Sequence, residues 1–456
     1  MAGHYTGRSE HRLAQMSPGL ALFETSPSSR IDRQTKGTDM LDIRQLRENP
    51  DEIQARLRTR DPSIDLSELL SMDEQRRRII AEVEELKAER NAGSQDVAKK
   101  KRAGEDAAEL LARLSDVSNR ITELDDQLRQ TEGAIDDVIG RLPNIPHSSV
   151  PVGDKDEKVI TKEVGEKPAD GVIPHLELAE KKGILDFPRA AAIAGARFPM
   201  YFGLGAQLEM ALIQYMYFRH AKSGYTAVLP PFVANEESFY VSSQLPKFAD
   251  DIYQIEKDGL YLNPTAESLL VNLHRGEILE ADDLPKKYVA YTPCFRREAG
   301  AAGEEERGLI RVHQFNKVEM FQFTKPETSY DTLDELIADA EGVLEALGLH
   351  YRVAVLTTED MAQQASKTVD LEVYLPGQGR YYEVSSCSNC EAFQSRRGNI
   401  RYRPEPKAKP QFVHTLNGSG LATSRLMVAI LENNQEPDGT VRIPEVLQPI
   451  IGVETL

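Results

Sequence analysis

The residues best suited to chemistry lie in the stretch 288–323, which has the sequence YVAYTPCFRREAGAAGEEERGLIRVHQFNKVEMFQF. Alternating apolar residues at its two ends predict two strands, the second running from Arg311 to Phe323, with a Gly-, Ala- and Glu-rich loop between them. In a strand, residues two positions apart share a face. The two shared faces would carry a mixed polar and aromatic set: Arg296, Glu298, Arg311, His313, Phe315, Lys317 and Glu319.

This mixture suggests a particular ligand chemistry. A guanidinium group offers several donors in a fixed fork, which matches a phosphate group. An aromatic ring offers a flat surface for a base. Alternating charge alone is more typical of the solvated face of an antiparallel sheet. The combination of arginine with Phe315 favours a phosphate-binding site instead.

The core Phe295–Glu298 and the strand segment HQFNKVE, residues 313–319, resemble motif 2 of the class II aminoacyl-tRNA synthetases. Within that class the resemblance is closest to the seryl-tRNA synthetases of bacterial type. The family motif surrounds the nucleotide and commonly has FRSE where this chain has FRRE. On an ideal strand Arg297 faces away from Arg296, so the change is expected to be tolerated.

A second short element precedes this hairpin, NPTAESL at residues 263–269. Taken alone it predicts an ordinary helix start, with Thr265 as N-cap and an acid in the first turn. In the seryl family a TAE element lines the amino-acid pocket. The resemblance therefore implies that Thr265, Ala266 and Glu267 bind L-serine.

The segment RYYEVSSCSNCEAFQSRR, residues 380–397, carries oxygen donors of the kind that Mg²⁺ prefers. Cys387 and Cys390 have a spacing known from zinc and redox sites, but Cys294 is the only other cysteine. Buried structural thiols are therefore predicted. The family resemblance implies that Glu383 and Ser386 are metal ligands, and that this segment contacts ATP through Glu383, Val384, Ser385 and Ser386.

A fourth segment, NGSGLATSRLMVAILE at residues 417–432, predicts a glycine-flanked turn that leads into an apolar helix, capped by Asn417 or Ser419. A helix N-terminus can bind an anion, although a lone GxG more often marks a plain turn. The pattern GxGLxxxR resembles motif 3 of class II synthetases. There its arginine, here Arg425, meets ATP.

Ahead of these motifs, residues 66–138 predict two long helices. The second has an unbroken 4-3 seam: Leu110, Leu114, Val117, Ile121, Leu124, Leu128, Thr131, Ile135 and Val138. Gly93 and Gly104 are expected to weaken the helices near a tip that carries the basic run 99–102. A dimerisation coil, or a spacer with a solvated KKKR run, is the commoner use of such a hairpin. In the seryl family an arm of this kind contacts tRNA(Ser).

The composition limits the functions that these motifs could serve. The chain has 456 residues and a net charge of −18, which argues against general nucleic-acid affinity and requires any basic patch to be local. No apolar run approaches the roughly 18 residues of a membrane span. Three cysteines make no disulfide framework, so a cytoplasmic setting is expected. P-loop, Rossmann and class I synthetase motifs do not occur.

Three regions are predicted. Residues 1–39 are expected to be a disordered or non-native extension, with Met40 as the functional start. Residues 40–145 would form the tRNA-binding domain, and the proline-rich stretch 141–154 marks its boundary. Residues 146–456 would form the catalytic domain. In it a helix at 205–221 and a strand at 226–233 resemble motif 1, the dimer interface of the family, with Pro231 as its proline.

The resemblance, which runs from Met40 to the C-terminus, implies an α+β fold. An antiparallel two-helix coiled-coil arm would precede a class II domain built on an antiparallel β-sheet flanked by helices. It also implies a homodimeric serine–tRNA ligase that uses ATP and Mg²⁺ and charges tRNA(Ser), and it leaves open whether tRNA(Sec) is a second acceptor. A paralogue that charges a carrier protein, or a non-catalytic scaffold, are the alternatives.

The resemblance further assigns a role to each candidate residue. Arg296 would bridge the α-phosphate and the serine carboxylate, and Arg311 and Arg425 would hold the outer phosphates. Phe315 would stack on adenine, with Glu298 fixing the base and Arg297 beside it. Glu267 and Glu319 would neutralise the serine ammonium, while Thr265 and Ser419 would shape the pocket for its hydroxyl.

Overall fold

The computed structural model describes residues 41, 43–299 and 308–456, which belong to one compact unit. The extension predicted for residues 1–39 and the start predicted at Met40 lie outside the described residues, as does most of the loop between the two predicted strands. The N-terminal helices are α1 (Ile43–Glu48), α2 (Pro50–Arg58), α3 (Ser67–Ala103) and α4 (Ala108–Arg141). The remaining helices are α5 (His175–Lys182), α6 (Phe187–Ala194), α7 (Gly203–Lys222), α8 (Glu236–Val241), α9 (Glu267–Leu270), α10 (Ser329–Ala346), α11 (Phe393–Arg397), α12 (Thr423–Asn433) and α13 (Gln448–Ile451).

An eight-stranded sheet forms the centre of the molecule, in the order β1-β9-β10-β11-β14-β8-β7-β2. Its strands are β1 (Val159–Val164), β2 (Thr226–Val228), β7 (Lys286–Phe295), β8 (Gln314–Thr324), β9 (Tyr351–Val355), β10 (Lys367–Leu375), β11 (Arg380–Asn389) and β14 (His414–Ala422). Neighbouring strands are antiparallel except β2 and β7, which are parallel. Two small sheets comprise β3 (Val233–Asn235), β4 (Gln254–Ile255) and β5 (Leu260–Leu262), and β6 (Ile278–Glu280), β12 (Arg401–Arg403) and β13 (Gln411–Phe412).

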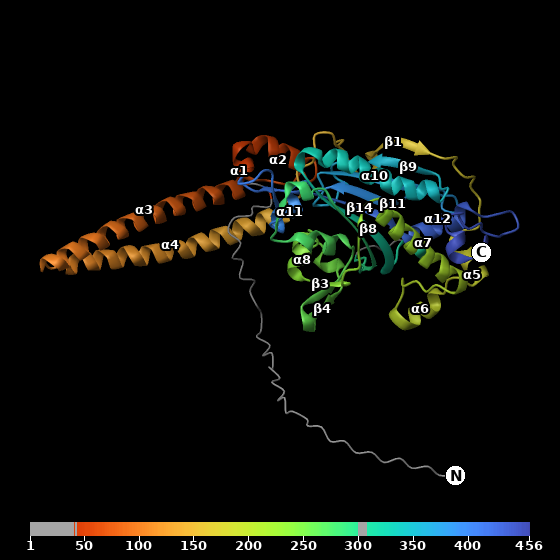
Figure 1. The fold of residues 1–456 in the computed structure, drawn as a ribbon, viewed down its shortest axis with the longest axis horizontal. Helices are drawn as coiled ribbons and strands as arrows, with labels where there is room; N and C mark the ends of the chain where they lie inside the picture. The colour runs from red at the N-terminus through yellow and green to blue at the C-terminus, as the bar shows by residue number, and fades with distance from the viewer. Residues whose placement is uncertain (1–40, 42, 300–307) are drawn as a thin grey trace, which may run out of the picture. The chain divides into compact units, whose positions relative to one another are not determined.

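Helices α7, α10 and α12 pack against one face of the large sheet and share its main hydrophobic cluster (Figure 1). On β8, Val318 and Met320 point into this cluster. Since side chains alternate along a strand, Lys317 and Glu319 point to the opposite face. The sequence prediction of an α+β fold built on an antiparallel sheet is confirmed, and polar residues of β8 are left on the face away from these helices.

The coiled-coil arm is confirmed as well. Helices α3 and α4 run antiparallel and lie side by side (Figure 1), and every predicted seam residue of α4 is buried or half-buried. Pairs such as Arg113–Glu89 (2.6 Å) and Arg120–Glu82 (2.8 Å) link the two helices. These ion pairs are exposed and contribute little, roughly 0–1 kcal/mol each, so the apolar seam supplies most of the stabilisation.

The two glycines near the tip differ from each other. Gly104 ends α3 with a left-handed φ of 75°, which suits a helix C-cap. Gly93 lies inside α3, and the helix continues past it to Ala103. Gly93 does not interrupt the helix, and its weakening effect stays a prediction. A Cβ at this position would lie 2.7 Å from Leu114 Cδ2, so the glycine permits close approach of α4.

At the base of the arm, Asp73 is 1% exposed and pairs with Arg47 (3.3 Å), Arg76 (2.8 Å) and Arg77 (3.1 Å). We expect Asp73→Ala to lower the free energy of unfolding by about 3 kcal/mol, because it leaves the partly buried guanidinium groups without their counter-ion. The neighbouring Glu74 pairs with Arg78 in solvent, so Glu74→Ala should change it by less than about 0.5 kcal/mol. Urea unfolding of both variants measures the difference. Equal decreases in the free energy of unfolding would contradict the stabilising role assigned to the Asp73 ion pairs.

Three element predictions need correction. The second strand of the central hairpin begins at Gln314 and not at Arg311, because a 3-10 turn at Gly308–Ile310 precedes it and Val312 is buried. The predicted turn at residues 417–420 is the interior of β14. Gly418 is needed there for close packing, since a Cβ would lie 3.0 Å from Cys387 Sγ.

The strand predicted at 226–233 is divided. Residues 226–228 form β2 at the edge of the large sheet, and β3 begins at Val233 in a small sheet. Pro230 and Pro231 lie between them, and proline cannot donate a ladder hydrogen bond. In the part of the chain that the structure describes, no helix combines the length and hydrophobicity needed to cross a bilayer.

Candidate active site

A polar cavity of about 430 Å³ lies on the face of the sheet opposite α7, α10 and α12. Many of the residues predicted from sequence line it: Thr265, Glu267, Arg296, Glu298, Arg311, Glu383, Ser386 and Ser419. They come from the segment before α9, from β7 and β8 with their connection, and from β11 and β14. Residues from all four motif-like segments, 263–269, 288–323, 380–397 and 417–432, therefore meet in one place.

Two carboxyl groups lie at one end of the cavity: Glu267 lines it, and Glu319 contacts the lining residues Thr265 and Lys317. Glu319 on β8 is fully buried, and its Oε2 accepts a hydrogen bond from Thr265 Oγ1 (3.0 Å) and contacts the ammonium of Lys317. Its other oxygen, Oε1, is buried without a hydrogen-bond partner among the described residues. A buried carboxylate oxygen without a donor is unfavourable, which points to a ligand that supplies one.

Glu267 lies beside this group at the first residue of α9. Its Oε1 accepts hydrogen bonds from Gln364 Nε2 (3.0 Å) and Gln394 Nε2 (2.6 Å). Burial, together with the nearby charge of Glu319, raises the pKa of Glu267 to about 7. The opposing effects of Lys317 and the two amides are smaller. The site thus contains two carboxyl groups and one lysine, an arrangement that a further cation would complete.

Thr265 does not cap α9. The helix has no side-chain cap, and Thr265 donates to Glu319 while its Oγ1 accepts from Glu267 N (3.3 Å). Ala266 is fully buried in an apolar cluster with Phe321 and does not line the cavity with its side chain. Ser419 lines the cavity from β14, where it pairs in register with Glu319.

The arginines sit at the other end. Arg296 follows β7 directly, is exposed, and has its guanidinium 5.2 Å from the centre of the Phe315 ring. Arg311 Nε donates to Glu298 Oε2 (2.6 Å). Glu298 has a left-handed φ of 53°, which turns the chain out of the strand after Arg297. Such backbone strain is common where a side chain must be aimed at a ligand.

Arg425 lies in the first turn of α12 and donates through Nη1 to the carboxylate (2.8 Å) and the backbone carbonyl (2.5 Å) of Glu383. Arg311 and Arg425 therefore each lie against a glutamate, Glu298 and Glu383 respectively. Both pairs are partly exposed, so an anionic ligand can compete for the guanidinium groups.

A β-bulge brings Glu383 and Ser386 together. The register of β10 and β11 shifts between Leu371 and Glu372, so that Glu383 lies opposite Glu372 and Ser386 opposite Asp370. Three residues apart on a regular strand, the two side chains would face opposite ways. With the bulge, both line this cavity.

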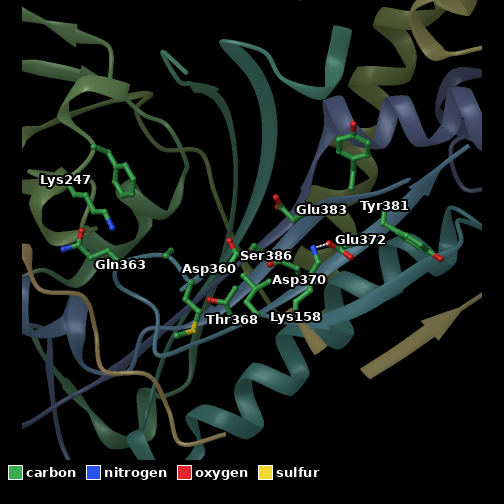
Figure 2. Close-up of a pocket in the computed structure, with 15 residues that line it drawn as sticks. Lys158, Lys247, Asp360, Gln363, Thr368, Asp370, Glu372, Tyr381, Glu383 and Ser386 are labelled. Carbon is green, nitrogen blue, oxygen red and sulfur yellow. Dashed lines mark hydrogen bonds and ion pairs between the residues drawn. The ribbon is translucent and has the colours of Figure 1, made fainter. Parts of the chain in front are cut away.

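Glu383 and Ser386 also border a neighbouring cavity of about 550 Å³, which Asp370 lines as well (Figure 2). Asp370 hydrogen-bonds to Ser386, while its Oδ1 is buried without a partner in the described part of the chain. Burial and the nearby Glu383 raise the pKa of Asp370 well above its usual range. The donors here are carboxylate and hydroxyl oxygens, so the set fits Mg²⁺.

Some predicted residues lie apart from the cavity. Val384 belongs to the hydrophobic core, and Ser385 Oγ donates to the carbonyl of Ser419 (2.6 Å). Arg297 is exposed near Tyr253. The ring of Phe315 lies under Arg296. Cys294, Cys387 and Cys390 are fully buried, as predicted for structural thiols.

The sequence reasoning missed several residues of the site. Asp370 occupies an alternating position between the apolar residues Val369 and Leu371 of β10, and that alternation was a usable signal. Gln364 and Gln394 come from segments without any motif, and only the fold places their amides on Glu267.

Comparisons with known proteins agree with this geometry. The family model described as "Seryl-tRNA synthetase N-terminal domain" matches residues 40–146, and that described as "tRNA synthetase class II core domain (G, H, P, S and T)" matches residues 250–434. A serine–tRNA ligase of Syntrophobacter fumaroxidans is 51% identical over 417 residues, which cover 91% of this chain and 99% of that protein. One of Geobacillus kaustophilus is 51% identical over 418 residues, with the same coverage. The crystal structure of seryl-tRNA synthetase from Pyrococcus horikoshii complexed with ATP is 39% identical, with a TM-score of 0.86, and covers 91% of this chain and 99% of that one.

Proposed function

The chain belongs to the seryl-tRNA synthetases of class II, and from this premise we propose that its cavity activates L-serine with ATP for transfer to tRNA(Ser). A serine carboxylate oxygen attacks the α-phosphorus of ATP, and pyrophosphate leaves. A hydroxyl of the terminal ribose of the tRNA then attacks the seryl carbonyl, and AMP leaves. Neither step needs a covalent enzyme intermediate, so positioning and charge stabilisation account for the rate.

The acidic end of the cavity carries the proposal. Glu319 Oε1 is buried without a donor among the described residues, and Glu267 is a second buried carboxyl group beside it. Among the described residues Lys317 is the cation in contact with Glu319, so a substrate ammonium supplies both the missing hydrogen bond and the second positive charge. An α-amino acid in this orientation directs its carboxylate toward Arg296.

Selection of serine would rest on small polar side chains. Thr265 and Ser419 line the same end of the cavity and suit a hydroxymethyl group. A pocket that hydrogen-bonds this hydroxyl disfavours alanine strongly, because the polar groups of the pocket are left unpaired. Threonine would be excluded by the size of the pocket.

ATP would occupy the end with the arginines. Arg296 would contact the α-phosphate and the serine carboxylate, while Arg311 and Arg425 exchange their glutamate partners for the outer phosphates. The base would stack on Phe315, with Glu298 at its edge and Arg297 nearby. Backbone groups of Val384 and Ser385 would contact the ribose of ATP.

Mg²⁺ would be held by Glu383 and Ser386. The oxygen-only donor set and the bulge that unites the two residues support this assignment. When bound, the ion supplies charge neutralisation for the phosphate oxygens. Release of Arg425 from Glu383 would let the carboxylate turn toward the metal and the guanidinium toward phosphate.

Residues 40–145 would act as the tRNA-binding domain and residues 146–456 as the catalytic domain, in keeping with the two separate family matches. The basic run 99–102 in the last turns of α3 is exposed and offers a local positive patch on an acidic chain. We place the contact with the tRNA there, because phosphate binding requires accessible cations. A cytoplasmic location belongs to the same proposal.

A homodimer is also part of the proposal. Apolar side chains are exposed on α7 and after β2: Met210 (60%), Phe218 (53%), Leu229 (73%) and Phe232 (37%). Clustered exposed apolar residues of this size favour a protein interface. Sedimentation of the wild type and of Leu229→Asp tests the dimer, which the charge should weaken.

Amino-acid-dependent ATP–pyrophosphate exchange tests the function. Without tRNA, serine should support exchange, and threonine, alanine, glycine and cysteine should not. Charging of tRNA(Ser), with tRNA(Sec) in parallel, then identifies the acceptor. Exchange with another amino acid would favour the carrier-protein paralogue, and absence of exchange with folded enzyme would favour the scaffold.

We predict a pH dependence that arises from Glu267. Below its pKa of about 7 the carboxyl is neutral and no longer balances the substrate ammonium, so kcat/KM for serine should fall as pH drops through 7. Glu267→Gln should abolish this fall of kcat/KM at low pH and raise the KM for serine about tenfold or more. Exchange rates from pH 5.5 to 8.5 measure both effects.

The same substitution should stabilise the protein at high pH. The pKa of Glu267 is raised in the folded state, so the unfolded chain loses this proton at a lower pH than the folded protein does. The free energy of unfolding is therefore highest at low pH and falls as the pH rises through about 7. At pH 8 Glu267→Gln should therefore raise the free energy of unfolding by about 1–3 kcal/mol. Glu280 is exposed, and Glu280→Gln serves as the matched control. A pH-independent KM for serine in the wild type would contradict the assignment.

A further inference from the structure

The segment Met361–Ser366 connects β9 to β10 without regular secondary structure. It lines the candidate amino-acid pocket with Ala362 and Gln364, and Gln364 Nε2 donates to Glu267 Oε1 (3.0 Å). Within the segment one turn hydrogen bond forms, from Ala365 N to the carbonyl of Ala362 (3.0 Å), so most of its backbone groups must be satisfied from outside.

All six carbonyl groups of this segment accept hydrogen bonds from residues outside it, five of them from Arg60 and Asn144 of the N-terminal region and one from His147. Asn144 N donates to the carbonyl of residue 363 (2.8 Å), Asn144 Nδ2 to that of residue 364 (2.9 Å), and His147 N to that of residue 366 (2.8 Å). Arg60 Nη2 donates to the carbonyls of residues 361 (2.7 Å) and 362 (2.8 Å), and Nη1 to that of residue 365 (3.0 Å).

Arg60 is an unusual donor for such a role. It follows α2, and its guanidinium group also donates to the carbonyl of Asn144 (3.0 Å), so it links the two N-terminal attachments to each other. Burial lowers the pKa of Arg60 to about 10. A half-buried guanidinium bonded to backbone carbonyls is costly to desolvate, and it remains favourable only while those carbonyls stay in place.

We propose that Arg60 and Asn144 are positioning residues for serine recognition: they fix the segment Met361–Ser366, which in turn holds Gln364 against Glu267. This inference rests on the proposed function, because Glu267 is the group that meets the serine ammonium. It gives the N-terminal domain a part in amino-acid activation that is separate from contact with tRNA. Because Gln364 contacts Glu267 directly, loosening the segment weakens serine binding more than ATP binding.

Arg60→Lys tests this inference in pyrophosphate exchange without tRNA. Lysine keeps the charge but lacks the fork that spans several carbonyls, so the KM for serine should rise about three- to tenfold while the KM for ATP stays within about twofold. Arg58→Lys is the matched control, because Arg58 Nε donates to a carbonyl, that of Ile64 (2.8 Å), away from the segment. It should leave both KM values unchanged.

A double variant tests whether Arg60 acts through Gln364. Gln364→Met should itself raise the KM for serine, and adding Arg60→Lys should raise it no further, because both changes release the same contact. Multiplying effects in the double variant would overturn the route through Gln364. An equal rise in both KM values, or no rise in either, would overturn the positioning role.

If Arg60→Lys does not yield folded protein, Asn144→Asp gives the same test. It removes the Nδ2 donor to residue 364 with little change of shape and retains the Oδ1 acceptor for Ile145 N (2.9 Å). The KM for serine should rise selectively here too, and an unchanged KM for serine would refute the inference. Serine-dependent exchange by the wild type in the same assay separates failure of this inference from failure of the proposed function.

Discussion

Arg296→Ala is expected to lower kcat/KM for serine-dependent ATP–pyrophosphate exchange by about 10³-fold. Arg296 is exposed and lines the cavity, and its Nε reaches the carbonyl of Pro264, the residue before Thr265. Negative charge develops around the α-phosphorus as the serine carboxylate attacks it. A guanidinium fixed at that point stabilises the transition state more than the separate substrates.

The position of Arg296 depends on its surroundings. Its Nε donates to the carbonyl of Pro264 (3.4 Å), next to Thr265, and its guanidinium lies over the Phe315 ring. The arginine therefore contacts both the element that precedes the serine pocket and the ring proposed for adenine. Arg296→Lys keeps the charge but loses the planar fork, and we expect it to recover only about tenfold of the loss.

Arg275 provides the matched control. It is an arginine on a neighbouring segment that pairs with Glu237 (3.3 Å) and does not line the cavity. Arg275→Ala should leave exchange within about twofold of wild type. Thermal unfolding should be similar for both variants, because Arg296 is exposed. Near wild-type exchange by Arg296→Ala would sink the central assignment of the site.

Whether each element could be predicted depends on how much of its structure is encoded locally in the sequence. The seam of α4 was predictable because each buried position repeats at helical spacing and needs no partner to be recognised. The start of β8 was misplaced because alternation continues through Arg311 and His313, although Gly308–Ile310 form a turn just before them. Periodicity shows which residues could share a face, and the neighbouring chain determines where the strand begins.

The β-bulges in β11 and β14 were the main features that could not be predicted from the sequence. Glu383 and Ser386 face the same cavity only because the β10–β11 register shifts near Val384, and a similar shift occurs in β14 after Ser419. Both strands contain small residues at these points, Ser385 and Gly420, yet small residues also suit turns. The predicted turn at residues 417–420 was the result of that ambiguity.

Glu383→Gln is expected to lower kcat for exchange by about 10²-fold and to raise the free Mg²⁺ needed for half-maximal rate by about tenfold. The amide retains the shape of the carboxylate and can still accept from Arg425, so the fold of β11 should be preserved. What is lost is the negative charge that holds a divalent cation near the phosphates.

The strand opposite supplies a control matched in type and register. Glu372 pairs with Glu383 across β10 and β11, but its carboxylate is engaged by Arg352 (2.6 Å) and Lys158. Glu372→Gln should lower the free energy of unfolding by up to about 3 kcal/mol, because it unbalances a buried ion pair, and should leave the Mg²⁺ requirement unchanged. Rates titrated against free Mg²⁺ at saturating serine and ATP separate the two.

The Mg²⁺ titration also tests how Arg425 acts. If Glu383 exchanges Arg425 for the metal, then Arg425→Ala should lower the affinity for ATP and also lower the Mg²⁺ concentration needed for half-maximal rate, since the carboxylate is freed from its ion pair. Glu383→Gln and Arg425→Ala would then have opposite effects on half-saturation by Mg²⁺. Identical Mg²⁺ curves for Glu383→Gln and the wild type would show that the metal is held elsewhere, and Asp370, with its unpartnered oxygen among the described residues, would be the next ligand to test.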